Sequence, residues 1–312
     1  MLSAPLILPR VRPVTRRRLP ERKPPVTIAA GLVCSDGVVL CADTQLTSNY
    51  KQPGQKLWLH EAAHLSVAMT GAGDYVLLKL VNGTIRHRIK GRMSLDRVLH
   101  GIVEPVLASV HADHIDKAPD WRVQNGYDVN VIVAIKTRTG VRLYESSRTG
   151  VSEITDYRCV GAGSPVGNYI AGNLFSPSLS VLWGQVCAAY LIQQTKAYGM
   201  DCGGETSIVV MPKDGPAVLL PPAEVRQIEL VANRIHEAFS PVMTACAEPQ
   251  LDGDGQDLEE AITIFKNAVT LARNHTIFQT FTQYAQQTLT QVGQPTRKTP
   301  KHDRKARKPS RA

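Results

Sequence analysis

The chain has 312 residues, 43% of them hydrophobic, so it can bury one large core with an extension, and no apolar run approaches the roughly 20 residues that a membrane-spanning helix needs. Its six cysteines lack paired spacing, which excludes a typical disulfide framework and favours reduced thiols in a cytoplasmic protein. The formal net charge of +9 comes from the two ends: residues 1–26 carry +6 and residues 297–312 carry +7, which leaves the body between them at −4.

Both ends of the chain are predicted to be disordered basic arms, over residues 1–26 and 291–312. They are rich in Pro, Lys and Arg and poor in large apolar side chains. A solvated tail without a specific partner explains this composition more simply than an arm that binds nucleic acid. We therefore expect no nucleic-acid partner and no membrane association.

Between the arms, hydrophobic periodicity predicts strands and paired helices in alternating groups. The first group comprises strands at Thr27–Cys34, Val38–Thr44, Lys56–His60 and Leu65–Thr70, then helices at Asp74–Arg88 and Ser94–Ile115. The second comprises strands at Asp128–Lys136, Val141–Glu145 and Tyr157–Val160, helices at Pro165–Asn173 and Leu179–Tyr198, and strands at Thr206–Met211 and Ala217–Leu220. From about residue 223 to about residue 290 the pattern is helical, interrupted by a polar stretch at residues 248–257.

This order of elements is not the strict alternation of a parallel β-α-β fold. The runs GLVC and VVLCA in the first two strands are apolar at nearly every position, so we expect both faces of these strands to be covered. Two stacked antiparallel sheets with helices outside meet that requirement. The sequence predicts an α+β fold, a four-layer αββα sandwich over residues 27–222, with a helical extension over residues 223–290.

The first predicted hairpin ends in polar side chains. A three-residue Ser35–Gly37 loop would pair Cys34 with Val38 and Thr27 with Gln45, and would place Asp43 diagonally across from Thr27. A buried aspartate needs a cation, and Lys56 is the nearest candidate in sequence. Taken alone, these residues favour a polar rim with a structural ion pair over a catalytic site.

A family resemblance changes that interpretation. Thr27, the run DGVVLCADTQLTS, Lys56 followed by Leu-Trp-Leu, and MTGAGD at Met69–Asp74 resemble proteasome β-type subunits, which are N-terminal nucleophile hydrolases of αββα fold. VGAGS and DCGGETS occur at the expected places, so the similarity covers roughly residues 27–220. The glutamine after the Asp-Thr pair is similar to the bacterial proteasome-like branch.

The resemblance implies a threonine-type peptidase that cleaves peptides or unfolded proteins without a metal or other cofactor. Thr27 would be the nucleophile and its own α-amino group the base, and Lys56, held by Asp43, would lower the pKa of that amine. The backbone N–H of Gly71 would stabilise the oxyanion. The remaining positions that the resemblance assigns to catalysis are Asp201 and Cys202, and those that it assigns to substrate binding are Gln45, Leu46, Thr47, Trp58, Met69 and Gly73.

Two positions depart from the family pattern. Ala162 stands where the family has a serine that supports the terminal amine, and Cys202 stands where it has a second serine; the partnering aspartate aligns only if Asp201 is shifted. The alternative is therefore a non-catalytic, proteasome-like scaffold or interaction subunit. In either case the family implies a homo-oligomer, a ring or stacked rings, whereas an ATPase partner stays unknown.

Two other motifs compete with this interpretation. HEAAH at residues 60–64 fits the HExxH pattern of zinc peptidases, but the stretch Lys56–Thr70 is better interpreted as a hairpin whose turn holds both histidines. GAGSPVG, which begins at Gly161, has Val166 where a dinucleotide loop needs its third glycine. We expect neither zinc nor a nucleotide cofactor.

The amine mechanism requires a chain that begins at Thr27. Residues 1–26 are therefore expected to be a propeptide or the product of a start codon placed too early. Val26 supports the second possibility, because a GUG start codon that is read as internal sequence appears as valine. We expect the mature protein to begin at Thr27.

Overall fold

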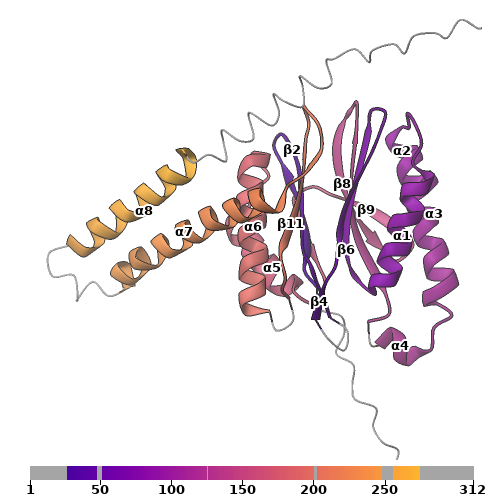
Figure 1. Ribbon diagram of the computed structural model, residues 1–312, viewed down its shortest axis with the longest axis horizontal. Coiled ribbons are helices and arrows are strands. Elements are labelled where there is room, and N and C mark those ends of the chain that lie inside the picture. The colour runs from indigo at the N-terminus through magenta and orange to yellow at the C-terminus, as the bar shows by residue number, and fades with distance from the viewer. Residues whose placement is uncertain (1–26, 48–50, 125, 200–201, 248–255, 275–312) are drawn as a thin grey trace, which may run out of the picture.

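The computed structural model describes residues 27–47, 51–124, 126–199, 202–247 and 256–274. In it, two five-stranded antiparallel sheets stack face to face and helices cover both outer faces (Figure 1). The predicted αββα sandwich is confirmed. The predicted arms at residues 1–26 and 291–312, and the part of the predicted extension after residue 274, lie outside the described residues.

The first sheet contains the predicted N-terminal hairpin at its centre, in the strand order β10-β1-β2-β11-β12. Its strands are β1 (Ala29–Cys34), β2 (Gly37–Asp43), β10 (Tyr157–Val160), β11 (Thr206–Pro212) and β12 (Val218–Leu219). Every residue of β2 is buried, because one face packs on the second sheet and the other on helices. The uninterrupted apolar run in the sequence thus correctly indicated a strand covered on both faces.

The second sheet has the strand order β5-β6-β7-β8-β9. Its strands are β5 (Leu57–Ala62), β6 (Leu65–Gly73), β7 (Val129–Thr137), β8 (Gly140–Ser147) and β9 (Gly150–Ile154). A separate two-stranded ribbon, β3 (Gln45–Thr47) and β4 (Lys51–Pro53), extends from the end of β2. Strands β3, β4 and β9 were not predicted from the sequence, because they are short and carry few large apolar residues.

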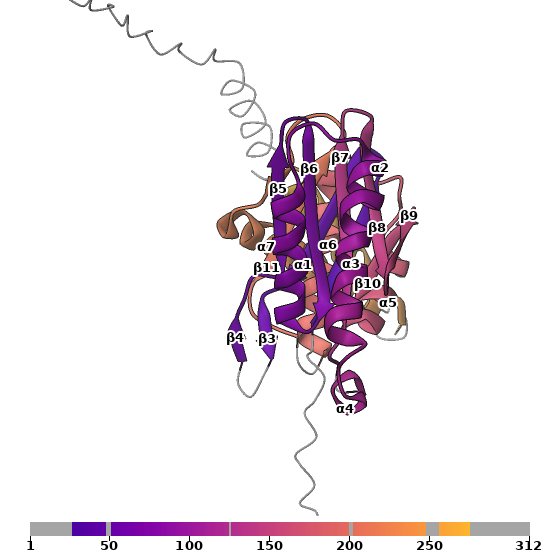
Figure 2. The ribbon, with the colours of Figure 1, turned by 90° about the vertical axis from the view of Figure 1, so that its right-hand side faces the viewer.

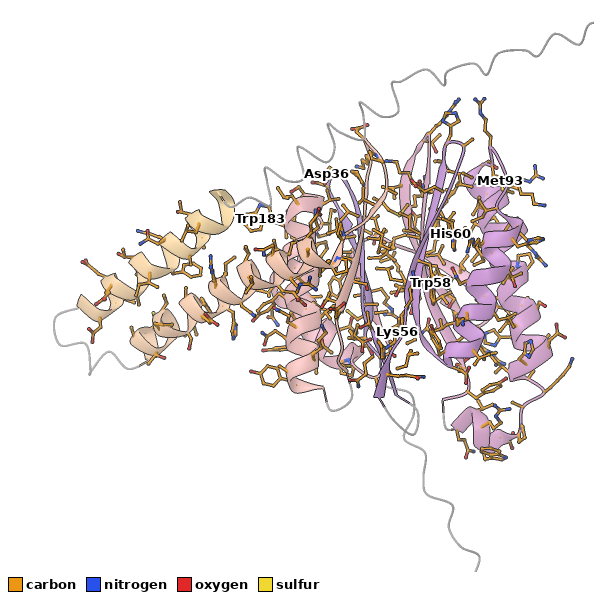
Figure 3. The ribbon with its side chains drawn as sticks, in the orientation of Figure 1. Asp36, Lys56, Trp58, His60, Met93 and Trp183 are labelled. Carbon is orange, nitrogen blue, oxygen red and sulfur yellow. The ribbon has the colours of Figure 1, made fainter. Side chains whose placement is uncertain are left out.

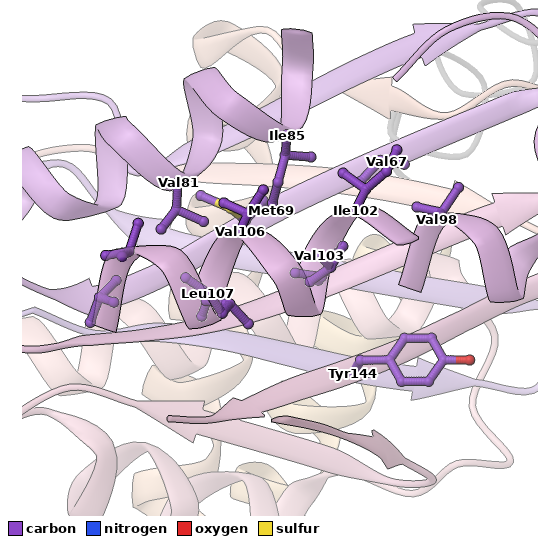
Figure 4. Close-up of a cluster of buried hydrophobic side chains, with 14 of the residues drawn as sticks. Val67, Met69, Val81, Ile85, Val98, Ile102, Val103, Val106, Leu107 and Tyr144 are labelled. Carbon is purple, nitrogen blue, oxygen red and sulfur yellow. The ribbon is translucent and has the colours of Figure 1, made fainter. Parts of the chain in front are cut away.

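One helical layer covers the second sheet; Figure 2 shows α1 and α3 lying over its strands. It comprises α1 (Tyr75–Arg88), α2 (Leu95–Val98), the π-helical turn η1 (Leu99–Val103), α3 (Glu104–Val110), a second π-helical turn η2 (His111–Ile115) and the short α4 (Asp120–Gln124). The side chain of Asp74 caps α1 by accepting N–H groups of its first turn. The single helix predicted over Ser94–Ile115 is therefore one continuous helical path with two π-turns. Figure 4 shows the aliphatic side chains that join this layer to the sheet.

The other helical layer covers the first sheet and continues into the C-terminal extension. It comprises α5 (Ser164–Leu174), α6 (Val181–Tyr198), α7 (Pro222–Ala247) and α8 (Gln256–Asn274). The first turns of α7 bury Val225 and Ile228 in the core beneath α6, whereas its second half projects away from the sandwich beside α8 (Figure 1). Among the described helices, none is both long and apolar enough to cross a membrane.

The register of the first hairpin differs by one residue from the predicted register. Cys34 pairs with Gly37, not with Val38, so the turn has two residues, Ser35 and Asp36. Gly37 lies within β2, where an added Cβ would lie 2.5 Å from the carbonyl oxygen of Met211. Glycine is required here for this close approach to β11 and not for a left-handed turn. The predicted diagonal placement of Thr27 and Asp43 was therefore wrong, and Asp43 is held beside Ile28.

Candidate active site

Three polar side chains meet in the interior of the sandwich at the end where β2 finishes. The Lys56 Nζ donates to the Thr27 Oγ1 at 2.7 Å and to the Asp43 Oδ1 at 2.7 Å. Thr27 is 5% exposed, Lys56 2% and Asp43 0%. Figure 3 shows Lys56 at the opposite end of the sandwich from Asp36, which lies in the first hairpin turn. These three residues are in contact, as the sequence predicted, although the hairpin register on which that prediction was based is wrong.

Asp43 is fixed by backbone donors as well as by the lysine. Its Oδ1 accepts the N–H of Ile28 at 3.3 Å, and its Oδ2 accepts the N–H of Gly203 at 3.2 Å. Asp43 can lie in the core because these donors satisfy its buried carboxylate oxygens. Its orientation is thus set jointly by the residue that precedes β1 and by the loop that precedes β11.

Lys56 lies directly before β5 and is also fixed at its backbone, since the Thr70 Oγ1 donates to its carbonyl oxygen at 3.0 Å. Burial lowers the pKa of its ammonium group, and the adjacent Asp43 carboxylate offsets only part of that effect. A lysine with a lowered pKa releases its proton more readily than an exposed one. Its position against the Thr27 hydroxyl therefore allows it to accept a proton from that hydroxyl or to act on it as a charge.

The main chain of Thr27 is held by the VGAGS loop. The Gly163 N–H donates to the Thr27 carbonyl oxygen at 3.2 Å. Gly161 has φ +97°, and an added Cβ there would lie 2.1 Å from the same oxygen. Only glycine combines this backbone conformation with so close an approach. Neither glycine had a predicted role in the site, although the Gly-x-Gly spacing is visible in the sequence.

The remaining predicted catalytic positions lie around this group. Cys202 is buried next to the VGAGS loop, since a Cβ added to Gly163 would lie 2.9 Å from the Cys202 Sγ. Asp201 lies outside the described residues. Gly71 follows Thr70 in β6, and the register of β5 and β6 extrapolates to place it opposite Lys56.

An open strand edge passes the site. The pairing of β5 with β6 ends at Leu57 and Thr70, whereas β6 continues to Gly73 and stays paired with β7. Among the described residues, no strand pairs with Gly71–Gly73 on the side that β5 vacates. An extended peptide could pair with this edge, as in strand-addition recognition.

The predicted substrate-binding residues divide into two groups. The first group forms β3, which follows directly after β2 at the site: Gln45, Leu46 and Thr47. The Gln45 N–H donates to the Gly203 carbonyl oxygen at 3.1 Å, and Leu46 packs against Gly54. Trp58 and Met69 are direct cross-strand neighbours, both buried in the core beneath the α1–α3 layer. The described contacts do not join Leu46 to this second group.

The HEAAH motif does not form the helical arrangement of a zinc peptidase. His60 and Glu61 lie in β5, and His64 lies in the following turn with φ 63°. The His60 Nε2 is hydrogen bonded to the Asn82 Oδ1 at 2.7 Å. Within the described residues, no group of three or more His, Cys, Asp or Glu side chains could hold a metal ion.

A second polar cluster next to Asp43 was not predicted from the sequence. Lys196 from α6, Thr206 from β11 and Glu229 from α7 are joined by short hydrogen bonds. These three residues are separated along the chain and belong to no local motif. Only the tertiary structure brings them together.

Comparisons with known proteins support a proteasome-like fold. No family model matches the sequence. A proteasome subunit alpha of Methanoculleus marisnigri is 28% identical over 141 residues, which are 44% of this chain and 55% of the relative, so the chain spans about half the length of that relative. Anbu (ancestral beta-subunit) from Yersinia bercovieri has a TM-score of 0.59 at 12% identity and covers 70% of this chain and 97% of its own. The Anbu complex from Pseudomonas aeruginosa, described as a helical assembly, has a TM-score of 0.55 at 15% identity and covers 69% and 96%.

Proposed function

We propose that the protein is a threonine-type peptidase of the proteasome β-subunit kind, with residues 27–222 as its hydrolase domain. The observation that carries the proposal is the buried contact of the Thr27 hydroxyl with Lys56, which Asp43 holds in turn. The buried Lys56 ammonium has three donors, and any neighbouring oxygen could accept a donor that Asp43 does not. An activated hydroxyl nucleophile, in contrast, needs a neighbouring base or cation in just this position.

The proposed chemistry is acyl transfer to Thr27. When the chain begins at Thr27, its α-amino group, with a pKa of about 7.7–8, takes the hydroxyl proton as the oxygen attacks the scissile carbonyl. The Lys56 ammonium lowers the pKa of that amine by charge repulsion and faces the developing negative charge. The Gly71 N–H is the proposed oxyanion donor. The tetrahedral intermediate then collapses: the scissile C–N bond breaks, and the α-amino group passes the proton to the leaving amine, which departs. Water hydrolyses the remaining ester, releases the carboxylic acid product and restores Thr27.

The proposed substrate is an extended, unfolded peptide. It adds as a strand between the free edge at Gly71–Gly73 and the β3 segment. Leu46 of this β3 segment carries no charge, so an apolar residue is expected to precede the scissile bond. We further propose a cytoplasmic homo-oligomer, in keeping with the helical assembly described for the Anbu complex; the ATPase partner, if there is one, is not identified.

A non-catalytic scaffold is the second candidate. The observation that favours it is the replacement of both family serines near Thr27, by Ala162 and by Cys202. Without those hydroxyls the terminal amine loses two expected hydrogen-bond partners. The scaffold keeps the fold and the assembly but does not cleave peptides.

The test is hydrolysis of fluorogenic peptides with an apolar residue before the scissile bond. We expect cleavage that persists in the presence of a chelator, falls to background in Thr27→Ala and is unchanged in Thr139→Ala, a matched substitution in an exposed turn. Cleavage that survives Thr27→Ala overturns the proposal. Loss of activity on chelation points to a metal enzyme instead, and the absence of cleavage in every form favours the scaffold.

A further inference from the structure

A second group of charged side chains lies beside the proposed site, on the side of the helical layer. The Lys196 Nζ donates to the Thr206 Oγ1 at 2.7 Å, and the Thr206 Oγ1 donates to the Glu229 Oε1 at 2.5 Å. The Lys196 Nζ also lies 3.7 Å from the Glu229 Oε1. The three residues come from α6, β11 and α7, so this contact joins the C-terminal extension to the sandwich.

The position of the group on the sheet brings it next to Asp43. Thr206 is the direct partner of Asp43 in the β2–β11 ladder and is 5% exposed. The side chains of Lys196 and Glu229 are each 18% exposed, so water screens them only in part. The Lys196 charge acts on Asp43 and also on Cys41, two residues earlier on the same face of β2. Lys196 therefore lies over the end of β2 from the α6 side.

Four of the described ionisable groups around this strand end balance one another in charge. Asp43 and Glu229 supply two carboxylates, and Lys56 and Lys196 supply two ammonium groups. Burial lowers the pKa of Lys196, and the charges of Glu229 and Asp43 oppose that effect. The Cys202 thiol also faces Lys56, and Glu205 acts on Lys196 from the exposed surface, where it pairs with Arg226 at 3.4 Å. Asp201 lies outside the described residues.

A purely structural anchor for α7 does not account for this arrangement. Val225 and Ile228 already attach the helix through apolar burial, and apolar contacts anchor a helix at least as well as a partly buried ion pair. The charged group is instead placed at the one ladder position of β11 that is paired with Asp43.

We propose that Lys196, Thr206 and Glu229 form a positioning network that sets the charge balance of the Thr27–Asp43–Lys56 site. Through Glu229, helix α7 contributes to the electrostatics of that site. This inference rests on the proposed function of that site. Lys196 acts through its charge on the Asp43 carboxylate that Lys56 contacts, and Glu229 limits how much positive charge Lys196 adds. The extension thereby tunes the readiness of Lys56 to release a proton.

The network predicts shifts of opposite sign from its two charged members. Lys196→Met removes a positive charge near Lys56, so protonated Lys56 becomes more favourable and its pKa rises. Glu229→Gln leaves the Lys196 charge uncompensated, so the pKa of Lys56 falls. A unit charge several ångströms away at an effective dielectric constant of about 20 corresponds to a shift of about one pH unit. The double variant removes both charges and should return the pKa close to that of the wild type.

The experiment is an NMR titration of the full-length chain labelled at lysine Cε and Nζ, with the Lys56 resonance assigned by its loss in Lys56→Arg. This readout requires no turnover, so it separates failure of the network from failure of the proposed peptidase. We expect opposite shifts of about one unit in the single variants and cancellation in the double variant. If the wild type cleaves peptides, the alkaline limb of its pH–rate profile, where the Lys56 ammonium loses its proton, should move in the same directions.

Two control variants distinguish charge from packing. Lys196→Arg keeps the positive charge and should leave the titration unchanged, and Arg226→Met removes a charge from the exposed face of α7 and should also have no effect. Shifts of the same sign in Lys196→Met and Glu229→Gln, or shifts below about 0.2 unit in both, overturn the inference. Should Lys196→Met fail to fold, Glu229→Gln is compared with Lys196→Arg. A lowered pKa of Lys56 in Glu229→Gln alone supports the network, and an unchanged pKa in both variants overturns it.

Discussion

The two outer helical layers of the sandwich differ in the kinds of side chain that they place against their sheets. The α1–α3 layer meets its sheet through aliphatic side chains such as Val81, Ile85 and Leu107 (Figure 4). The α6–α7 layer also buries apolar side chains, but in addition it places Lys196 and Glu229 next to Asp43. One layer stabilises the fold, and the other stabilises it and also shapes the electrostatics of the site. Substitutions on the two sides should therefore separate stability from function.

The largest effect is expected from breaking the central ion pair. Asp43→Asn keeps the shape of the side chain but leaves the buried Lys56 ammonium without its carboxylate. Loss of one partner of a buried pair costs about 3–5 kcal/mol, so the free energy of unfolding measured by denaturant titration should fall by that amount. An unchanged unfolding midpoint would mean that Lys56 is neutral or finds another partner, and peptidase activity should be lost in either case.

In the α1–α3 layer, Leu107→Ala should affect stability alone. Leu107 is fully buried, and removing its side chain leaves a cavity that costs about 2–5 kcal/mol. Chemical denaturation measures this loss, while the pH dependence of peptide cleavage per folded molecule should stay that of the wild type. A shifted pH profile would contradict the division of labour between the two layers.

Gly161→Ala tests the close contact between the VGAGS loop and the Thr27 main chain. The added Cβ would meet the Thr27 carbonyl oxygen at 2.1 Å in a backbone conformation with φ +97°. The strain is expected to cost about 1–3 kcal/mol in stability, and the displacement of Thr27 should abolish cleavage. Gly140→Ala is the matched control: its φ is +133° but no atom lies within 4 Å, so it should lose stability without losing activity.

The lowered pKa of Lys56 predicts a pH dependence of stability. Between that lowered pKa and the ordinary lysine value of about 10.4, the unfolded chain binds one more proton than the folded chain at this residue, so the free energy of unfolding rises with pH. The slope from one proton is about 1.4 kcal/mol per pH unit. Denaturant titrations across the alkaline range should show this slope in the wild type and a smaller slope in Lys56→Met. Identical slopes would contradict a lowered pKa of Lys56 in the folded chain.

The smallest effect is expected from an exposed ion pair. Arg142 and Glu153 lie 3.3 Å apart on the surface of β8 and β9, with side chains 56% and 44% exposed. Glu153→Gln should change the free energy of unfolding by less than about 1 kcal/mol, because water screens the pair. A change as large as that of Asp43→Asn would show that burial does not distinguish the two pairs.

Much of the fold follows from local patterns in the sequence. Apolar runs covered on both faces, as in β2, and the order of strands and paired helices are sufficient to predict two sheets between helical layers. The turn of the first hairpin was predicted one residue too long because Ser-Asp-Gly suits either turn length. What decides between them is the packing of Gly37 against β11, a contact with a segment some 170 residues away.

The site was predictable only in part, for the same reason. Thr27, Asp43 and Lys56 belong to adjacent elements and to a recognisable motif, so their encounter could be anticipated. Lys196, Thr206 and Glu229 come from three elements whose proximity depends on the final packing of α6 and α7. Their residue types carry no signal until the structure places them beside Asp43.

Whether Thr27 is an N-terminal nucleophile can be decided by mass spectrometry of the protein from its native host, before and after reaction with a peptide carrying an electrophilic β-lactone. We predict a mature chain that begins at Thr27 and gains the mass of one opened lactone, located by peptide mapping as an ester on the Thr27 hydroxyl. A chain that retains residues before Thr27 and takes up no lactone there would contradict the peptidase and leave the non-catalytic scaffold.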